Sequence, residues 1–272
     1  KLSLAYKKKI DLVFITNPSS MHINTVLKLK NLKNTYIFVE KPLDSNLKNI
    51  NKLKSFLRRN NNKIFVGFNL KFHDGYQRLK SIINNDKQLG KLNYTIFKYG
   101  ENLKNFHKYE DYKISYAAKK NLGGGVSLTS IHEIDLMLDL FEDCKIINSH
   151  IDKLSNLKID VEDFSASTFR CKFKKKKIIS LIILDFFQFT TERYIKMIFE
   201  NGEVYLDFNS NYLSVSKKNS KKVYKYLRNK NIMYKKEIKI FFNLFKNKKQ
   251  IPKEFSLDNS IRSLKIVEKI KK

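Results

Sequence analysis

Two residues of this sequence have the strongest case for acid–base chemistry, a lysine and a histidine that stand far apart in the chain. Lys41 follows Glu40 at the end of a short apolar run. His132 lies in a predicted helix, on one stripe with Thr129 and Asp135, because residues three apart share a helix face. Histidine titrates near neutrality, and a lysine in a closed site can have a lowered pKa, so both can exchange protons. We expect Asp135 to fix the tautomer of the His132 ring.

Alternating strands and helices position Lys41. Continuous apolar runs predict strands at 10–16, 36–39 and 64–68, and helical spacing predicts helices at 21–29 and 47–57. This β-α-β-α-β order with short connections predicts a parallel, doubly wound sheet. In such sheets ligands bind at the carboxyl ends of the strands, which is where Lys41 lies.

The rest of the chain predicts a second region that is rich in strands. The expected elements are a helix at 76–83, a strand at 91–99, a polar and aromatic loop at 101–120, a helix at 126–141, strands at 164–173, 178–187, 194–199, 203–206 and 212–215, and helices at 232–245 and 256–270. Hairpins are predicted at Asn201-Gly202 and at the run from Lys174 to Lys177. The predicted fold class is α/β plus α+β: a partial Rossmann sheet in residues 1–70, then a largely antiparallel open sheet with helices in 71–272.

The composition favours a folded protein without a nucleic-acid partner. Hydrophobic residues make up 42% of the chain, and 55 Lys+Arg against 26 Asp+Glu give a formal charge of +29. That charge would suit an anionic partner. However, only seven of the basic residues are arginines, the preferred readers of phosphate and guanine, and no reader motif occurs. We therefore interpret the lysine excess as a composition bias, and nucleic-acid binding rests on net charge alone.

The cysteines and three of the histidines show no pattern of a metal site. Cys144 and Cys171 form no CxxC pair, so both are predicted to be reduced core residues. His73, His107 and His150 have no partner at a useful spacing and are interpreted as structural. No run approaches the roughly 18 apolar residues of a membrane span, and no signal-like segment opens the sequence. We expect a cytoplasmic protein without metal or membrane partner.

Four segments, taken together and in this order, resemble the Gfo/Idh/MocA oxidoreductase family. They are Phe14-Ile15-Thr16-Asn17-Pro18 with His22, Val39-Glu40-Lys41-Pro42, Gly67-Phe68-Asn69-Leu70-Lys71-Phe72, and Gly123-Gly124-Gly125-Val126 with His132-Glu133-Ile134-Asp135-Leu136. The loop containing Tyr109-Glu110-Asp111-Tyr112 and Ser115-Tyr116 further resembles members associated with bacterial surface-sugar synthesis.

The resemblance implies an enzyme that transfers a hydride between NAD or NADP and the hydroxyl or keto carbon of a sugar or nucleotide sugar. Lys41 and His132 are then the catalytic residues. The implied cofactor contacts are Thr16, Asn17, Pro18, His22, Glu40, Lys41 and Asn69. The implied substrate contacts are Tyr109, Asp111, Tyr112, Tyr116, Thr129 and His132. Analogy of fold also predicts a homo-oligomer formed through the second sheet.

Two departures from the family pattern keep alternatives open. The family often has an aspartate four residues before the histidine, where this sequence has Leu128. No GxGxxG precedes Ile10, so we expect the first βαβ unit, whose glycine loop holds the cofactor pyrophosphate, to be missing. The alternatives are a catalytically inactive homologue that binds a sugar or a partner, and a fragment without its own cofactor site.

Overall fold

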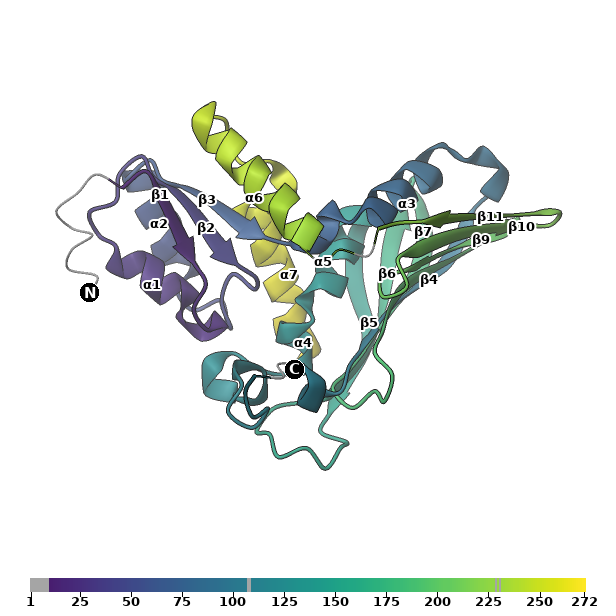
Figure 1. The fold of residues 1–272 in the computed structure, drawn as a ribbon, viewed down its shortest axis with the longest axis horizontal. Coiled ribbons are helices and arrows are strands. Elements are labelled where there is room, and N and C mark those ends of the chain that lie inside the picture. Colours follow the sequence, from purple (N-terminus) through teal and green to yellow (C-terminus); the bar gives the residue numbers. More distant parts are fainter. Residues whose placement is uncertain (1–9, 107–108, 228, 230) are drawn as a thin grey trace.

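The computed structural model describes residues 10–106, 109–227, 229 and 231–272, which form two sheets (Figure 1). The first sheet is parallel, in the order β1-β2-β3, and consists of β1 (Leu12–Ile15), β2 (Tyr36–Glu40) and β3 (Lys63–Gly67). Helices α1 (His22–Lys28) and α2 (Ile50–Arg59) connect its strands. The first four residues of β2 are buried, as expected for a central strand covered on both faces. This part of the sequence prediction is confirmed.

Helix α6 (Asn231–Lys246) covers one face of the first sheet, although it comes from the far end of the chain (Figure 1). Its Phe241 ring lies 5.5 Å from the ring of Phe38 and 5.6 Å from that of Phe65. Phe255, in the turn after α6, stacks on Phe65 at 4.7 Å. Residues beyond 230 therefore cover this face of the first sheet, and packed aromatic rings make the contact.

The second sheet has eight strands in the order β11-β10-β9-β8-β4-β7-β6-β5. They are β4 (Leu92–Gly100), β5 (Glu142–Asp152), β6 (Phe164–Phe173), β7 (Lys176–Asp185), β8 (Glu192–Phe199), β9 (Gly202–Asp207), β10 (Tyr212–Lys217) and β11 (Ser220–Lys225). Strands β4 and β7 pair in parallel, and the other neighbours are antiparallel. One face carries α3 (Asp74–Asn85), α4 (Val126–Thr129), α5 (Ile131–Leu140) and α7 (Leu257–Ile270).

The predicted fold class is confirmed, and the differences lie in single elements. The edge strands β5 and β11 were not predicted, because their side chains are mostly exposed and polar and show no apolar alternation. The predicted helix at 126–141 is two helices, α4 and α5, interrupted at Ser130. Both predicted hairpins are present, and the tip of the β6–β7 hairpin has positive φ at Lys174 and Lys175. The division of the chain into two domains at residue 70 stays a prediction, because α6 belongs to the second part of the sequence but packs on the first sheet.

The remaining sequence expectations concern cysteines and membranes. Cys171 is buried, Cys144 is half-buried on the neighbouring strand, and both are free thiols. None of the helices in the described ranges is long and apolar enough to cross a bilayer. Within the same residues no three His, Cys, Asp or Glu side chains gather as they would around a metal ion. His107 lies outside the described residues.

Candidate active site

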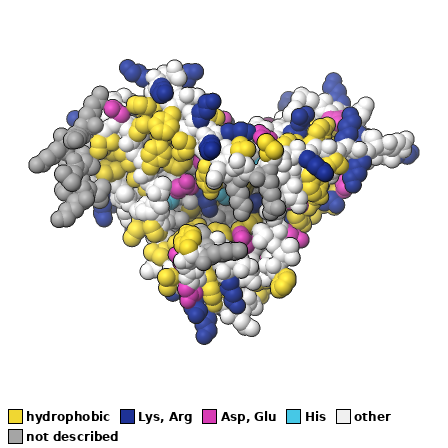
Figure 2. Space-filling model, viewed as in Figure 1, with side chains coloured by type: hydrophobic (Ala, Val, Ile, Leu, Met, Phe, Trp, Pro, Cys, Tyr) yellow, Lys and Arg dark blue, Asp and Glu magenta, His cyan; other side chains and the backbone are white. Residues whose placement is uncertain are grey.

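A cavity of about 610 Å³ opens where the two sheets approach each other, near the middle of the face shown in Figure 2. Its lining comes from the ends of β2 and β3, the junction of α4 and α5, strands β4 and β8, and the start of α6. Lys41, Asn69, Thr129 and His132 are among the residues that line it. The structure therefore brings the predicted lysine and histidine, 91 positions apart in the numbering, into one cavity.

Lys41 is held in the cavity wall at the end of β2. Its Nζ donates a hydrogen bond of 2.8 Å to the carbonyl oxygen of Thr129, at the end of α4. Burial lowers the pKa of Lys41 to about 8; the charge of Glu40 opposes this effect and that of Arg193 adds to it. The amine can therefore exchange a proton close to neutral pH.

The His132 ring packs edge-on against Phe68, with 5.8 Å between ring centroids. Its Nδ1 is buried and has no hydrogen-bond partner in the structure. Burial, and then the charges of Lys41 and Arg193, hold the pKa of His132 well below its usual range. The ring is therefore neutral at neutral pH, and the expectation that it titrates near neutrality is wrong.

Asp135 does not orient His132, as the sequence had suggested, because its carboxylate is engaged elsewhere. Its Oδ2 forms an ion pair of 2.9 Å with Lys71, and both side chains are almost fully buried. Its Oδ1 accepts a hydrogen bond of 2.8 Å from Asn259 Nδ2 on α7. Asp135 thus joins α5 to the turn after β3 through Lys71 and to α7 through Asn259, so the prediction that Asp135 fixes the tautomer of His132 is wrong.

The glycine triplet before α4 lets this helix junction approach the preceding loop. A Cβ on Gly124 would lie 2.5 Å from the carbonyl oxygens of Tyr116 and Ala117, closer than any side chain allows. Gly123 and Gly125 have φ of +83° and +99°, which glycine adopts readily. The triplet thus sets the position from which the Thr129 carbonyl reaches Lys41.

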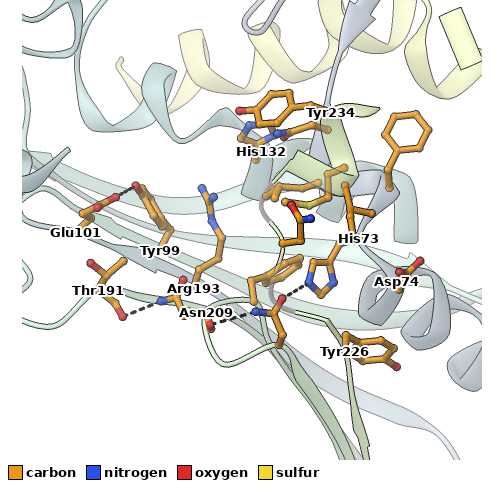
Figure 3. A pocket seen from close by; sticks show the side chains of 18 of the residues that line it. His73, Asp74, Tyr99, Glu101, His132, Thr191, Arg193, Asn209, Tyr226 and Tyr234 are labelled. Atoms are coloured by element: carbon orange, nitrogen blue, oxygen red, sulfur yellow. Dashed lines mark hydrogen bonds between the residues drawn. The ribbon is translucent and has the colours of Figure 1, made fainter. Parts of the chain in front are cut away.

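A cluster around Arg193 completes this end of the cavity and was not predicted (Figure 3). Arg193 Nε donates to Glu133 Oε1 at 2.8 Å, and its guanidinium carbon lies 3.9 Å from the centroid of the Tyr99 ring. Tyr99 in turn donates a hydrogen bond of 2.5 Å to Glu101. The sequence held two weak signals: arginine is rare in this chain, and Glu133 adjoins His132. The cluster places a permanent cation beside Lys41 and His132.

The other end of the cavity is lined by aromatic and amide side chains (Figure 3). His73 Nε2 lies 3.1 Å from Asn211 Oδ1, and the His73 ring packs against Phe208 at 5.0 Å. His73 Nδ1 also accepts a hydrogen bond from Gly75 N, at the start of α3. His73 thus has the structural role that the sequence analysis gave it, as the cap of α3. Its side chain also lines the cavity, which the sequence did not indicate.

The residues of the implied cofactor set lie at or near the carboxyl edge of the first sheet. Asn17 Oδ1, after β1, and Asn69 Oδ1, after β3, are buried and have no partner in the structure. His22 is fully buried, and its ring nitrogens lie 2.7 Å from the carbonyl oxygens of Asn17 and Pro42. His22 therefore joins the turns after β1 and β2, whereas the two asparagines present unused amide oxygens.

Of the implied substrate set, Thr129 and His132 line the cavity, and four residues from the 101–120 loop are not in its described lining. Tyr109 is 83% exposed, and Asp111 accepts a hydrogen bond from the backbone of its own turn. The Tyr112 hydroxyl accepts a hydrogen bond from the backbone N–H of Lys158. Tyr116 is partly buried, and burial together with the Glu40 charge raises its pKa to about 12. From the same loop Glu101 and Phe106 do line the cavity, so the part of the loop that lines it among the described residues is its beginning.

Comparisons with known proteins agree with this geometry. Residues 2–68 match the model of the Gfo/Idh/MocA family, described as an oxidoreductase family with an NAD-binding Rossmann fold. An uncharacterized oxidoreductase of Bacillus subtilis is 28% identical over 82 residues, which are 30% of this chain and 24% of that protein. The matched segment thus spans about a quarter of the curated relative.

Solved structures resemble the whole chain. The UDP-N-acetylglucosamine 3-dehydrogenase of Acidithiobacillus ferrooxidans has a TM-score of 0.76 at 14% identity and covers 100% of this chain and 80% of its own. A 3-ketoreductase from Actinomadura kijaniata, solved with NADP and TDP-benzene, has 0.80 at 12%, covering 100% and 80%. The myo-inositol 2-dehydrogenase of Lactobacillus plantarum has 0.76 at 18%, covering 99% and 79%. The resemblance predicted from the sequence is confirmed, in the family match of residues 2–68 and in the fold.

Proposed function

We propose that this chain, with a Gfo/Idh/MocA match in residues 2–68 and the fold of sugar and cyclitol dehydrogenases throughout, is an NAD(P)-dependent oxidoreductase acting on a sugar or nucleotide sugar. One observation carries the proposal. Lys41, with a pKa of about 8, and the neutral His132 line the same cavity. Such a pair can move the proton of a hydroxyl group while the carbon atom gains or loses a hydride.

In the oxidation direction the neutral amine of Lys41 takes the proton of the substrate hydroxyl. In reduction the Lys41 ammonium returns that proton to the carbonyl oxygen. The His132 imidazole, which stays neutral, donates a hydrogen bond to the same oxygen without competing for its proton. The fixed charge of Arg193 nearby favours negative charge that develops on this oxygen.

The carboxyl edge of the first sheet fits the nicotinamide end of a dinucleotide. The unpaired amide oxygens of Asn17 and Asn69 can accept hydrogen bonds from a carboxamide there. The turn at Pro18, the exposed end of β1 at Thr16 and the backbone at Glu40 complete the edge. When bound, the nicotinamide accepts or supplies the hydride. NAD and NADP are both compatible with these residues.

The size and lining of the cavity support a substrate larger than a single sugar ring. Its volume of about 610 Å³ falls within the range of sites for ligands of drug or nucleotide size. One end has proton-transfer groups, and the other has the His73, Phe208 and Tyr226 rings with amide groups between them. A nucleotide sugar can fill both ends, with its reacting carbon near Lys41.

The test is turnover by the protein expressed with any coding sequence that precedes Lys1, followed through nicotinamide absorbance with candidate sugars and nucleotide sugars. Lys41→Met should lower kcat by at least about 100-fold, as for loss of a general base. Lys48→Met, an exposed lysine of the same segment, is the control. Oxidation should speed up as pH rises through about 8, and reduction should slow down, because the neutral amine accepts the proton and the ammonium donates it. Unchanged turnover in Lys41→Met would refute the assignment.

A second candidate, an inactive homologue that binds a sugar or a partner, rests on Leu128. Its side chain lies in the hydrophobic core, 4% exposed, where the family often has an aspartate. This position therefore offers no proton acceptor. Binding of a nucleotide sugar without any turnover in the assay above, with either nicotinamide cofactor, would favour this candidate.

We also propose that two copies of the chain pair through the open face of the second sheet. Phe97 points toward the helices, so its neighbour Ile96 and the register partners on β7 point to the other face. On that face Tyr94 and Ile179 are 38% and 36% exposed. Sedimentation should give a dimer or larger oligomer for the wild type and a monomer for Ile179→Lys. A monomeric wild type would reject the proposal.

A further inference from the structure

Glu237 on α6 is a buried carboxyl that the proposed reaction does not use. Its side chain is 1% exposed, and its Oε1 has no hydrogen-bond partner in the structure. The carboxyl has a hydrogen bond with the backbone of Phe68, but an ionised carboxylate in such a place lacks both water and a compensating charge, and burial therefore disfavours it. The position of this group therefore calls for a reason beyond packing.

The alternation of β2 and the period of α6 bring Glu237 next to the Lys41 corner. Phe38 faces α6, so Glu40, two residues further along the strand, faces α6 as well. Glu237 lies one turn before Phe241, on the same face of the helix. A Cβ on Gly67, which pairs with Glu40 across the sheet, would lie 3.3 Å from Glu237 Oε1. The Glu40 and Glu237 carboxyls are therefore neighbours at the carboxyl edge of the sheet, close enough for the charge of Glu40 to act on Glu237.

Two neighbouring carboxyls in a closed site do not both ionise at neutral pH. Burial, and then the negative charge of Glu40, raise the pKa of Glu237 to about 8. Burial also raises the pKa of Glu40, but the charge of Lys41 works in the opposite direction. At neutral pH Glu237 therefore keeps its proton, and the ionised carboxylate of the two is Glu40, whose charge acts on Lys41.

We propose that Glu237 is a positioning residue for Lys41: together with Glu40 it forms a carboxyl pair that holds one proton, and the state of this pair sets the pH at which Lys41 is neutral. The inference rests on the proposed function only in taking Lys41 as the proton-transfer group. When Glu237 keeps its proton, one carboxylate stabilises the Lys41 ammonium. When Glu237 ionises, a second negative charge near the corner holds the proton on Lys41 to higher pH.

Other ionisable groups also lie near this corner. Glu133, whose charge acts on Lys41, has a pKa raised by burial and opposed by the charge of Arg193. Tyr234 on α6 and Tyr116 next to Glu40 both have raised pKa values, since burial and then the Glu40 charge favour their neutral forms. Arg193 stays a cation, paired with Glu133. Glu237 differs from these groups because it acts on Glu40 directly and its pKa of about 8 lies close to that of Lys41.

The experiment measures the reactivity of the Lys41 amine as a function of pH. Trace labelling with acetic anhydride, read by mass spectrometry of the Lys41 peptide, reports the neutral amine and needs neither cofactor nor turnover. Glu237→Gln keeps the shape of the side chain but never becomes negative. Its labelling midpoint should lie about half a pKa unit lower than that of the wild type. The two curves should coincide below about pH 7 and separate as pH rises through about 8, where wild-type Glu237 ionises. Glu203→Gln, which removes an exposed carboxylate from β9, is the matched control and should leave the midpoint unchanged.

The proposal is overturned if the labelling curves of Glu237→Gln and the wild type coincide at every pH, or if the variant's midpoint rises. A purely structural role for Glu237 predicts such coincidence, with only the unfolding midpoint altered. If Glu237→Gln does not fold, Glu237→Leu supplies the same comparison, because leucine is also neutral and close in volume. Absence of turnover with every sugar would reject the proposed function, whereas a shifted labelling curve would still support this inference.

Discussion

The stability of Glu237→Gln should depend on pH in a way that isolates one buried carboxyl. The pKa of Glu237 is raised from its ordinary 4.5 to about 8 in the folded chain. Between these values the unfolded state has released the proton and the folded state still holds it. The folded state then binds more protons, so wild-type stability falls as pH rises and levels off above about pH 8. Glutamine has no proton to release, so the variant lacks this loss.

The full shift corresponds to about 4.8 kcal/mol, of which about 2.5 kcal/mol falls between about pH 5 and pH 7. Because Glu237 is 1% exposed, solvent screening reduces this figure little. Urea unfolding at several pH values, with the m-value checked for constancy, gives the difference between variant and wild type. Glu237→Gln should gain on the wild type steadily as pH rises. A difference that stays constant, or one that shrinks, would show that Glu237 is ionised in the folded chain and that the reasoning is wrong.

Two more predictions concern the frame of the cavity. Lys71→Met should lower the free energy of unfolding, measured by urea unfolding, by about 3 to 5 kcal/mol, because it leaves the Asp135 carboxylate buried without its cation. The double variant Lys71→Met with Asp135→Leu should recover much of that loss. Gly124→Ala should lower the melting temperature more than Gly75→Ala. A Cβ at position 124 would lie 2.5 Å from two backbone carbonyl oxygens, whereas a Cβ at position 75 would first meet a leucine methyl group, which can rotate away. Equal losses in the single and double variants, or at the two glycines, would contradict these readings.

The sequence predicted the fold well wherever one face of an element is buried. Apolar runs and helical spacing located β1, β2 and β3 and the helices between them. It missed β5 and β11, because edge strands bury little and so carry little apolar alternation. The break at Ser130 was also invisible, since the apolar pattern continues through both helices. The elements that the sequence predicted correctly are therefore those with a clear pattern of buried residues, whatever the secondary-structure propensity of their residues.

The candidate site was predicted only where a motif marked it. Lys41, Asn69, Thr129 and His132 were named from the sequence and do line the cavity. Arg193 was not, because the contact of this strand residue with a helix residue 60 positions away leaves no pattern in the neighbouring sequence, and the rarity of arginine is only a weak signal. The loop tyrosines were named because their segment is long and polar and resembles family members associated with surface-sugar synthesis. Such a signal does not predict where a side chain points.

Helix α6 shows why the missing part of the site lies outside the reach of local patterns. Phe241 of this helix packs on one face of the first sheet, a role that the helical spacing of apolar residues in α6 predicts. One turn earlier, the same face carries Glu237, which a helix built only for packing would replace with an apolar residue. The helix places this carboxyl at the end of β2, where the buried aromatic contacts give way to Glu40 and Lys41. Packing of the far end of the chain and proton chemistry at its beginning therefore depend on one helix face, and a substitution on that face is expected to change both.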